Sequence, residues 1–213
     1  TSLDNYTEYN DWIELANTSA ISVNIGGYYL SDDVKDPRKW KIPSGAIIPA
    51  NGYKVIWADG RNEFAGGYLH ASFKLTQSKK NPDWILLSDA SGNLLERVQI
   101  RRHQKGHSIG KVSSNWQIFT TPTPEAINNG VYKVAYAASP IFSKTPGFYA
   151  ASFRVFLTNP EPNSRIYYTT DGTDPLAGGT QYNSSGILID STKIIKAVTY
   201  SFNTSILPSF FTF

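Results

Sequence analysis

The sequence predicts an all-β protein built from two β-sandwiches in tandem. Three observations lead to this prediction. Of the 213 residues, 14% are aromatic but only 17% are charged, against about 25% charged residues in a typical globular domain. The chain contains 16 glycines and 12 prolines, so residues that favour turns are frequent. Short segments with strand-like patterns recur between these turns.

The first half of the chain contains several strand-like segments, each bounded by turn residues. Trp12, Ile13, Glu14 and their neighbours alternate polar and apolar side chains in the first of them. Turn pairs such as Gly26-Gly27 and Asn51-Gly52 separate the segments. The last two segments are typical of a hairpin around residues 88–93. The predicted strands are 11–15, 28–30, 53–57, 84–87 and 94–100.

A change in composition near residue 130 divides the chain. Residues 121–124 (Thr-Pro-Thr-Pro) and 128–130 (Asn-Asn-Gly) form a polar stretch typical of a linker. All five tryptophans precede it, which favours two separately built cores. We therefore predict one domain over residues 1–130 and a second over residues 131–213. The strands predicted for the second domain are 152–157, 166–169, 187–189 and 194–200.

Alternation along these strands also predicts which side chains form the two cores. In the first domain, the predicted core residues are Ile13, Leu15, Val55, Trp57, Ile85 and Leu87. In the second domain, they are Phe153, Val155, Leu157, Ile166, Tyr168, Ile195 and Ala197. A shift of one residue in any strand would turn its predicted set to the opposite face.

Missing residue types exclude several classes of chemistry. The sequence has no cysteine, so disulfides, zinc sites with thiolate ligands and cysteine nucleophiles are excluded. No apolar run approaches the roughly 20 residues that a membrane-spanning helix needs. The chain begins with Thr1 and contains no methionine, so we expect a processed or trimmed product in which a signal peptide would not be visible.

A series of motifs in the first half resembles a known family. The motifs are Asp11-Trp12-Ile13-Glu14-Leu15-x-Asn17, Gly27-x-Tyr29-Leu30-Ser31-Asp32-Asp33, Lys39-Trp40-Lys41-Ile42-Pro43, Ile48-Pro49-Ala50-x-Gly52-Tyr53, Trp57-Ala58-Asp59-Gly60, Leu69-His70-x-x-Phe73-Lys74-Leu75 and Thr121-Pro122-Thr123-Pro124. Through them, residues 11–129 resemble the lamin-tail domain in its bacterial, secreted form. The resemblance implies an immunoglobulin-like fold.

The N-terminal residues depart from this family. There, an apolar strand precedes the Asp-Trp-Ile-Glu-Leu segment, whereas residues 1–10 are mostly polar. We therefore expect an open sheet edge near the N-terminus. The alternative is that residues 1–10 fold back as an irregular cover.

The second half carries a second set of family motifs. They are Pro140-x-Phe142-Ser143, Gly147-Phe148-Tyr149, Ile166-Tyr167-Tyr168-Thr169-Thr170-Asp171-Gly172-x-Asp174-Pro175 and Ile195-Lys196-Ala197. Residues 139–207 thereby resemble the small β-sandwich at the C-terminus of chitobiases and β-hexosaminidases. Together, the two resemblances imply two tandem immunoglobulin-like β-sandwiches.

Both resemblances imply an accessory role rather than an enzyme. We expect a non-catalytic interaction module of a secreted or cell-surface bacterial protein, serving adhesion, protein contact or spacing, with other domains of that larger protein as its partners. We expect an extracellular or cell-surface location. The alternative is a carbohydrate-binding module, because sugar rings stack on exposed aromatic side chains; the candidates are Tyr167, Tyr149 and Trp84. Packing and protein contact would equally explain these aromatics.

Two clusters of aspartates are candidate Ca²⁺ ligands, because Ca²⁺ prefers carboxylate oxygens. The first cluster comprises Asp32, Asp33 and Asp36, and the second comprises Asp171 and Asp174. Aspartates also stabilise tight turns through side-chain hydrogen bonds, and this second interpretation fits both clusters. We therefore expect no obligatory cofactor, with Ca²⁺ as a possibility.

Two short motifs suggest catalysis or metal binding, and their context argues against both. Residues 106–110 spell G-x-S-x-G with Ser108 at the centre, as in hydrolases whose serine lies on a turn between a strand and a helix. Neither a buried strand before it nor a helix after it is predicted. His103 and His107 have metal-ligand spacing only on a helix, and His70 is distant. We therefore predict no catalytic residues and no zinc site.

Charge is unevenly distributed along the chain, although the formal net charge is only +3. Residues 1–36 hold seven acidic residues and one basic residue. Residues 97–111 hold five basic residues and no acidic residue. Because nucleic-acid binding usually needs a larger basic excess over a whole domain, we do not expect a nucleic-acid partner.

Overall fold

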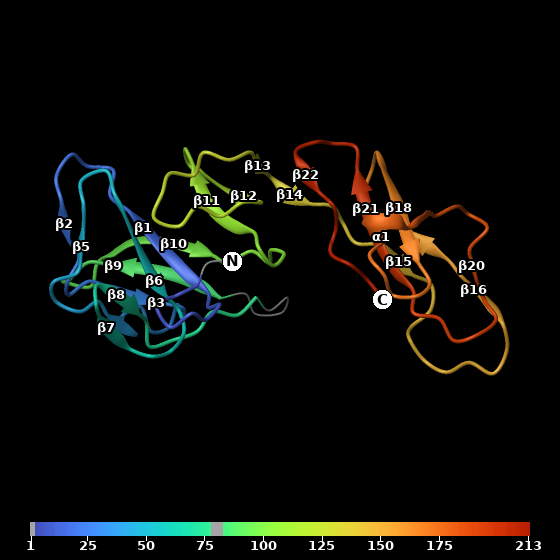
Figure 1. The fold of residues 1–213 in the computed structure, drawn as a ribbon, viewed down its shortest axis with the longest axis horizontal. Coiled ribbons are helices and arrows are strands. Elements are labelled where there is room, and N and C mark those ends of the chain that lie inside the picture. Colours follow the sequence, from blue (N-terminus) through green and yellow to red (C-terminus); the bar gives the residue numbers. More distant parts are fainter. Residues whose placement is uncertain (1–2, 78–82) are drawn as a thin grey trace. The chain divides into compact units, whose positions relative to one another are not determined.

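The computed structural model describes residues 3–77 and 83–213. It is all-β apart from one helix of four residues, so the predicted fold class is confirmed (Figure 1). The chain divides into two compact units, each described separately below. Unit 1 comprises Thr1–Gly110 and Phe119–Val131, and unit 2 comprises Lys111–Ile118 and Tyr132–Phe213. Within the described residues, no helix is long and apolar enough to cross a membrane.

Two four-stranded sheets dominate unit 1. Sheet A has the order β1-β6-β8-β7, formed by β1 (Trp12–Ala16), β6 (Tyr53–Trp57), β8 (Tyr68–His70) and β7 (Glu63–Ala65). Sheet C has the order β10-β9-β3-β4, formed by β10 (Leu94–Gln99), β9 (Trp84–Ser88), β3 (Tyr29–Ser31) and β4 (Trp40–Lys41). Strands β9 and β10 pair antiparallel, which confirms the predicted hairpin. A small ladder joins β2 (Val23–Asn24) to β5 (Ile47–Ile48).

The remaining strands form smaller sheets. One has the order β11-β12-β13, with β11 (Ser108–Val112), β12 (Asn115–Phe119) and β13 (Tyr132–Lys133). Another has the order β19-β18-β21, with β19 (Thr180–Gln181), β18 (Ser164–Thr169) and β21 (Lys196–Ser201). The two-stranded pairs are β14 (Ala135–Tyr136) with β22 (Ile206–Leu207), β15 (Ile141–Phe142) with β17 (Leu157–Thr158), and β16 (Phe153–Val155) with β20 (Ile187–Ile189).

The helix, α1 (Pro175–Gly178), begins at a turn that the sequence already marks. The Asp174 carboxylate accepts a hydrogen bond from the Leu176 backbone N–H at 2.8 Å, which caps the helix. Pro175 follows at the first helical position, where its fixed φ angle suits a helix. The cap and the proline explain why this short turn is helical within an all-β chain.

One face of sheet A forms the main core of unit 1. Strand register places Ile13 opposite Ile56, and Ile56 beside Leu69 of β8. Ile56 and Leu69 are fully buried, and all three belong to one hydrophobic cluster. Leu15, Ile85 and Leu87 pack against that cluster, as predicted.

The opposite face of sheet A is also buried, and it holds two of the predicted core residues, whereas the prediction missed Ile56 on the first face. Val55 and Trp57 are 7% and 5% exposed, but the strand alternation turns them away from the cluster that contains Ile56. Trp57 lies beside His70 of β8 on this second face. Because β6 is covered on both faces, its consecutive residues Val55, Ile56 and Trp57 are all apolar and do not alternate with polar residues. Alternation alone therefore could not identify Ile56 as the core residue.

The core of unit 2 agrees with the prediction. Val155, Leu157, Ile166 and Ala197 are buried in one cluster together with Ile187. Phe153, Tyr168 and Ile195 pack against it. All seven predicted residues therefore contribute to this core. Strand β16 keeps the simple alternation of a sheet covered on one side, whereas β21 buries both Ala197 and Val198.

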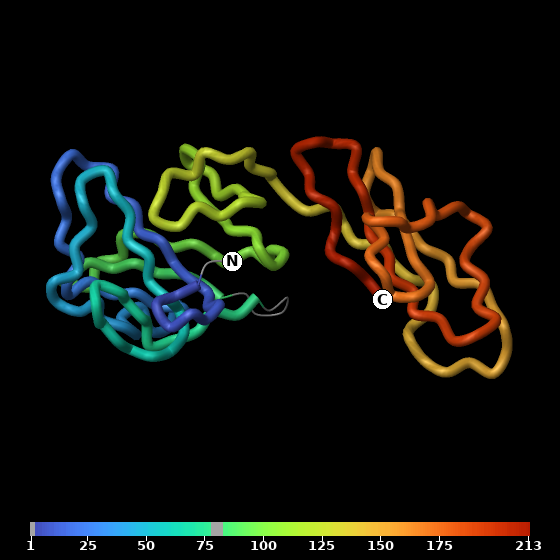
Figure 2. Tube along the Cα trace, viewed as in Figure 1, coloured from blue at the N-terminus to red at the C-terminus, as the bar shows by residue number. Residues whose placement is uncertain are grey.

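The N-terminal segment, residues 3–10, is an irregular cover and adds no strand to sheet A. Figure 2 traces it in dark blue as a loop beside the strands of unit 1. It contacts the second face of sheet A, because the Asn5 side chain lies 2.8 Å from His70 and Tyr6 hydrogen-bonds Glu63 of β7. Strand β1 lies at the edge of the sheet and pairs only with β6 among the described strands. The segment therefore covers a face of the sheet and, within its described residues 3–10, does not extend the β1 edge.

Candidate functional site

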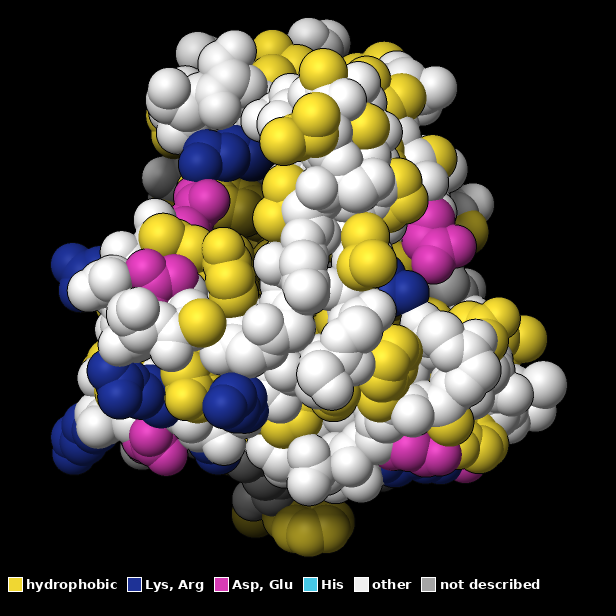
Figure 3. Space-filling model, turned by 90° about the vertical axis from the view of Figure 1, so that its left-hand side faces the viewer, with side chains coloured by type: hydrophobic (Ala, Val, Ile, Leu, Met, Phe, Trp, Pro, Cys, Tyr) yellow, Lys and Arg dark blue, Asp and Glu magenta, His cyan; other side chains and the backbone are white. Residues whose placement is uncertain are grey.

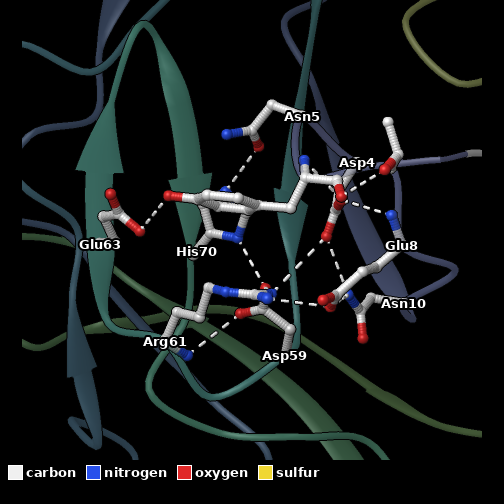
Figure 4. A network of polar contacts seen from close by, with 10 residues as sticks. Asp4, Asn5, Glu8, Asn10, Asp59, Arg61, Glu63 and His70 are labelled. Carbon is white, nitrogen blue, oxygen red and sulfur yellow. Dashed lines mark hydrogen bonds and ion pairs between the residues drawn. The ribbon is translucent and has the colours of Figure 1, made fainter.

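The densest set of ionisable side chains in the described residues lies under the N-terminal segment (Figure 4). At its centre, the Asp59 carboxylate lies 2.7 Å from Nδ1 of His70 and 2.6 Å from Nη1 of Arg61. Asp4, Asp59 and His70 are all at least nine-tenths buried. We call these residues, with Arg61, Glu8, Asn5 and Asn10, the polar network.

Local turns place the members of the network. Asp59 and Arg61 leave the end of β6 in a turn at Gly60, whose φ of 82° suits glycine, and the Arg61 N–H donates to the Asp59 side chain at 3.1 Å. His70 ends β8, which runs parallel to β6. Asp4 organises the N-terminal segment, because its Oδ1 accepts hydrogen bonds from the backbone N–H groups of Tyr6 and Glu8.

Arg61 and several hydrogen bonds keep the buried carboxylates of the network ionised. Burial alone would raise the pKa of Asp59, but hydrogen bonds from Arg61 and His70 outweigh it and hold that pKa below its usual value. Burial also opposes ionisation of Asp4, and hydrogen bonds from Glu8 and Asn10 with the charge of Arg61 lower its pKa. Hydrogen bonds to Glu8 and Asp59 raise the pKa of Arg61. Both carboxylates are therefore ionised at neutral pH.

The network does not have the chemistry of a metal site. Potential ligand atoms of Asp4, Asp59 and His70 lie within 4.8 Å of one another, which is metal-like spacing. However, the Arg61 guanidinium already lies 2.6 Å from Asp59 and 3.7 Å from Asp4. A fixed guanidinium thus already pairs with both carboxylates that a metal ion would need.

The network also lacks the geometry of a catalytic dyad. Nδ1 of His70 faces a carboxylate, which only accepts hydrogen bonds, so Nδ1 carries a proton. In a Ser-His-Asp arrangement, Nε2 would then face a nucleophile. Here, Nε2 lies 2.8 Å from the Asn5 side-chain oxygen, and the Tyr6 ring covers His70 at a centroid distance of 5.4 Å. The arrangement fastens the N-terminal segment to sheet A.

Asp32, Asp33 and Asp36 lie in a turn after β3 that is closed by hydrogen bonds. Asp32 forms an ion pair with Lys39 at 2.7 Å, and Asp33 accepts a hydrogen bond from the Lys35 backbone N–H at 2.8 Å. The Ser31 hydroxyl donates to the Asp36 carbonyl at 2.6 Å. Within the described residues, these three aspartates do not form a group with metal-ligand spacing. Calcium binding there stays a prediction.

Asp171 and Asp174 stabilise the turn between β18 and α1. The Asp171 carboxylate accepts hydrogen bonds from both the N–H and the hydroxyl of Thr173, which lower its pKa. Asp174 caps α1. Both carboxylates thus have the turn-forming role that the sequence offers as the alternative to Ca²⁺ ligation.

The three predicted carbohydrate-stacking residues lie in different surroundings. Trp84 of unit 1 is half-buried, and the Arg97 guanidinium lies 5.5 Å from its ring centroid. Tyr149 of unit 2 is 45% exposed, and its hydroxyl donates to the Thr145 carbonyl. Tyr167 is half-buried on β18, and no ring contact joins it to Tyr149 among the described residues. Tyr149 is the most accessible of the three.

The G-x-S-x-G motif lies in a hairpin. Ser108 is the first residue of β11, which pairs with β12, so no helix follows the serine. The His103 ring contacts the Gln77 side chain and the Arg101 carbonyl. Burial, followed by the nearby charge of His103, lowers the pKa of His107. Within the described residues, neither histidine joins an acidic residue in a metal-like group.

Basic residues from the segment 97–111 pack on tryptophans. Arg97 lies over Trp84, and the Lys111 ammonium lies 5.9 Å from the Trp116 ring centroid. Figure 3 shows one face of the molecule, on which acidic, basic and apolar side chains are interspersed. The absence of a nucleic-acid partner stays a prediction.

Sequence reasoning missed most of the polar network. Asp4 and Arg61 are 57 positions apart, and Asn5 and His70 are 65 apart. The acidic excess in residues 1–36 was the available signal, but it does not reveal that Arg61 is the partner of Asp4 and Glu8. Only the parallel pairing of β6 and β8 brings these side chains together.

Two family models match different parts of the chain. Residues 2–102 match the model of the Lamin Tail Domain, which has an immunoglobulin-like fold. This match confirms the resemblance of the first half of the chain to the lamin-tail domain. Residues 155–208 match the model described as Fn3 associated. A search of curated proteins and a search of solved structures found no match. The chain is therefore similar to the Lamin Tail Domain over residues 2–102 and to the Fn3 associated family over residues 155–208.

Proposed function

We propose that the chain is a non-catalytic accessory module of a secreted or cell-surface bacterial protein, in which it contacts or spaces larger partner domains. The observation that carries this proposal is that the ionisable side chains of the polar network hydrogen-bond one another. Asp59 and His70, which resemble part of a catalytic set, are bonded to Arg61 and Asn5. The secreted location rests on the resemblance of residues 11–129 to the bacterial, secreted form of the lamin-tail domain.

A direct test of the non-catalytic role uses the one hydrolase-like motif. Wild-type protein and a Ser108→Ala variant are incubated with short-chain and long-chain nitrophenyl esters. We expect the same background rate for both proteins, because Ser108 begins a strand and lacks the strand-to-helix turn that exposes a nucleophile. Ser113→Ala, in the neighbouring turn, is the matched control. An ester hydrolysis rate above background that disappears only in Ser108→Ala would overturn the proposal.

Carbohydrate binding is a second candidate function. Tyr149 favours it, because the ring is 45% exposed while the hydrogen bond to Thr145 and the Phe153 ring 4.5 Å away hold it in place. An immobilised aromatic ring loses little conformational entropy when a sugar stacks on it.

The test of this second candidate is co-sedimentation with insoluble cellulose, chitin and xylan. We expect wild-type protein to sediment with at least one of them and Tyr149→Ala to sediment several-fold less. Tyr9→Ala, which truncates an exposed tyrosine of unit 1, serves as the control. Equal sedimentation of all three proteins would contradict a role for Tyr149.

A further inference from the structure

Unit 2 exposes a compact group of one arginine and two aromatic side chains. Arg165 of β18 lies directly opposite Tyr200 of β21. The Arg165 guanidinium carbon lies 5.1 Å from the Phe202 ring centroid, and the Tyr200 and Phe202 rings are 6.5 Å apart and steeply inclined. We call Arg165, Tyr200 and Phe202 the arginine–aromatic patch.

The sheet directs this patch toward solvent. Tyr200 and Phe202 are 45% and 51% exposed, whereas their neighbours Thr199 and Ser201 are buried. Arg165 is exposed and precedes the buried Ile166. The Phe202 N–H donates to the Asn163 carbonyl at 3.0 Å, which fixes the end of the strand. Because none of the three side chains belongs to the core cluster of unit 2, core packing does not explain the two aromatic residues.

The charge around the patch favours an anionic ligand. Unit 2 contains seven lysines and arginines and four aspartates and glutamates, so the formal +3 charge of the whole chain arises in this unit. Its four acidic side chains already accept hydrogen bonds or form ion pairs elsewhere in the unit. Among the described residues, Arg165 has no acidic partner and contacts the Phe202 ring instead.

The shape of the patch indicates which anion fits. A guanidinium binds a carboxylate through two parallel hydrogen bonds, and the adjacent aromatic rings offer an apolar surface to the C–H face of a sugar ring. Nucleic acid would need several cations along its phosphates, whereas the patch has one. We propose that the arginine–aromatic patch binds an acidic polysaccharide, with a uronate carboxylate on Arg165 and the sugar ring against Tyr200 or Phe202. This inference rests on the carbohydrate-binding candidate above.

The experiment is affinity electrophoresis and calorimetry of the whole chain with three soluble polymers. Polygalacturonate carries carboxylates on sugar rings, dextran has sugar rings without charge, and polyglutamate has carboxylates without sugar rings. We expect binding to polygalacturonate only. Arg165→Gln and Tyr200→Ala should each weaken that binding about tenfold or more, because each removes an interaction of at least about 1.4 kcal/mol.

Two control variants distinguish binding at the arginine–aromatic patch from nonspecific effects of surface charge and exposed aromatic rings. Lys144→Gln removes one positive charge from the same unit, and Phe213→Ala truncates another exposed aromatic residue. Both should bind polygalacturonate like the wild type, and circular dichroism should show all variants folded. Equal weakening by Lys144→Gln, equal binding of polyglutamate, or no binding of polygalacturonate would each overturn the inference. Sedimentation with a neutral polysaccharide that depends on Tyr149, together with no binding of polygalacturonate, would overturn it while supporting carbohydrate binding itself.

Discussion

Replacing Ile56 by alanine is expected to lower the free energy of unfolding of unit 1 by about 2–5 kcal/mol. Ile56 is fully buried in the cluster that also contains Ile13 and Leu69, so the truncation removes apolar contacts and leaves a cavity. The measurement is urea unfolding followed by tryptophan fluorescence, because Trp40 and Trp57 are buried in the same unit.

The control for this experiment is Ile47→Ala. Ile47 is 51% exposed on β5, so its truncation should change the free energy of unfolding by less than about 0.5 kcal/mol. The comparison tests whether Ile56 belongs to the buried core. If Ile47→Ala and Ile56→Ala cost the same, the assignment of Ile56 to the core cluster is wrong.

Replacing Asp59 by asparagine is expected to destabilise unit 1 by about 2 kcal/mol at pH 7. The asparagine has nearly the same shape but no negative charge, so it weakens the hydrogen bonds to Arg61 and His70 and leaves Arg61 with less compensation. The N-terminal segment should loosen as well, because the network holds Asn5 against His70. Hydrogen exchange of residues 3–10 should therefore be faster in the variant.

The same substitution should flatten the pH dependence of stability. The pKa values of Asp4, Asp59 and Glu8 are lowered in the folded protein, so the unfolded chain binds more protons in acid. The stability that these groups supply is complete above about pH 4–5, their ordinary range, and is lost as the pH falls through the lowered values. Asp59→Asn lacks one of these contributions and should lose less stability in acid than the wild type.

The titration of Asp11 and Glu14 also changes stability with pH, so the stability of the variant is compared with that of the wild type at each pH. Burial raises the pKa values of Asp11 and Glu14, so their effect on stability has the opposite sign. Both are present in the wild type and in Asp59→Asn, so the difference between the two proteins isolates the network. Asp33→Asn, at an exposed turn, is the control and should follow the wild type. Parallel pH curves for wild type and Asp59→Asn would contradict the network's role.

Local patterns were enough to predict part of the strands, the hairpin and the core residues of unit 2, but not β7, β8, β11 and β12. The hairpin around residues 88–93 depends on a turn and two adjacent segments, and both are local. The capped turn at Asp171 and Asp174 is likewise visible as a short motif. In unit 2, β16 alternates between Phe153, Arg154 and Val155, so the period of two identifies its buried row.

The core residue of β6 and the polar network could not be predicted in the same way. Val55, Ile56 and Trp57 are all apolar, so the sequence contains no signal for which of them faces the main core; the pairing of β6 with β1 and β8 decides it. The network joins Asp4 to Arg61 and Asn5 to His70, and the arginine–aromatic patch joins Arg165 to Tyr200 and Phe202. Local sequence thus specifies the strands and turns, because the backbone preferences of neighbouring residues set them. Contacts between distant residues depend on strand order and register, and one local pattern is compatible with several orders and registers.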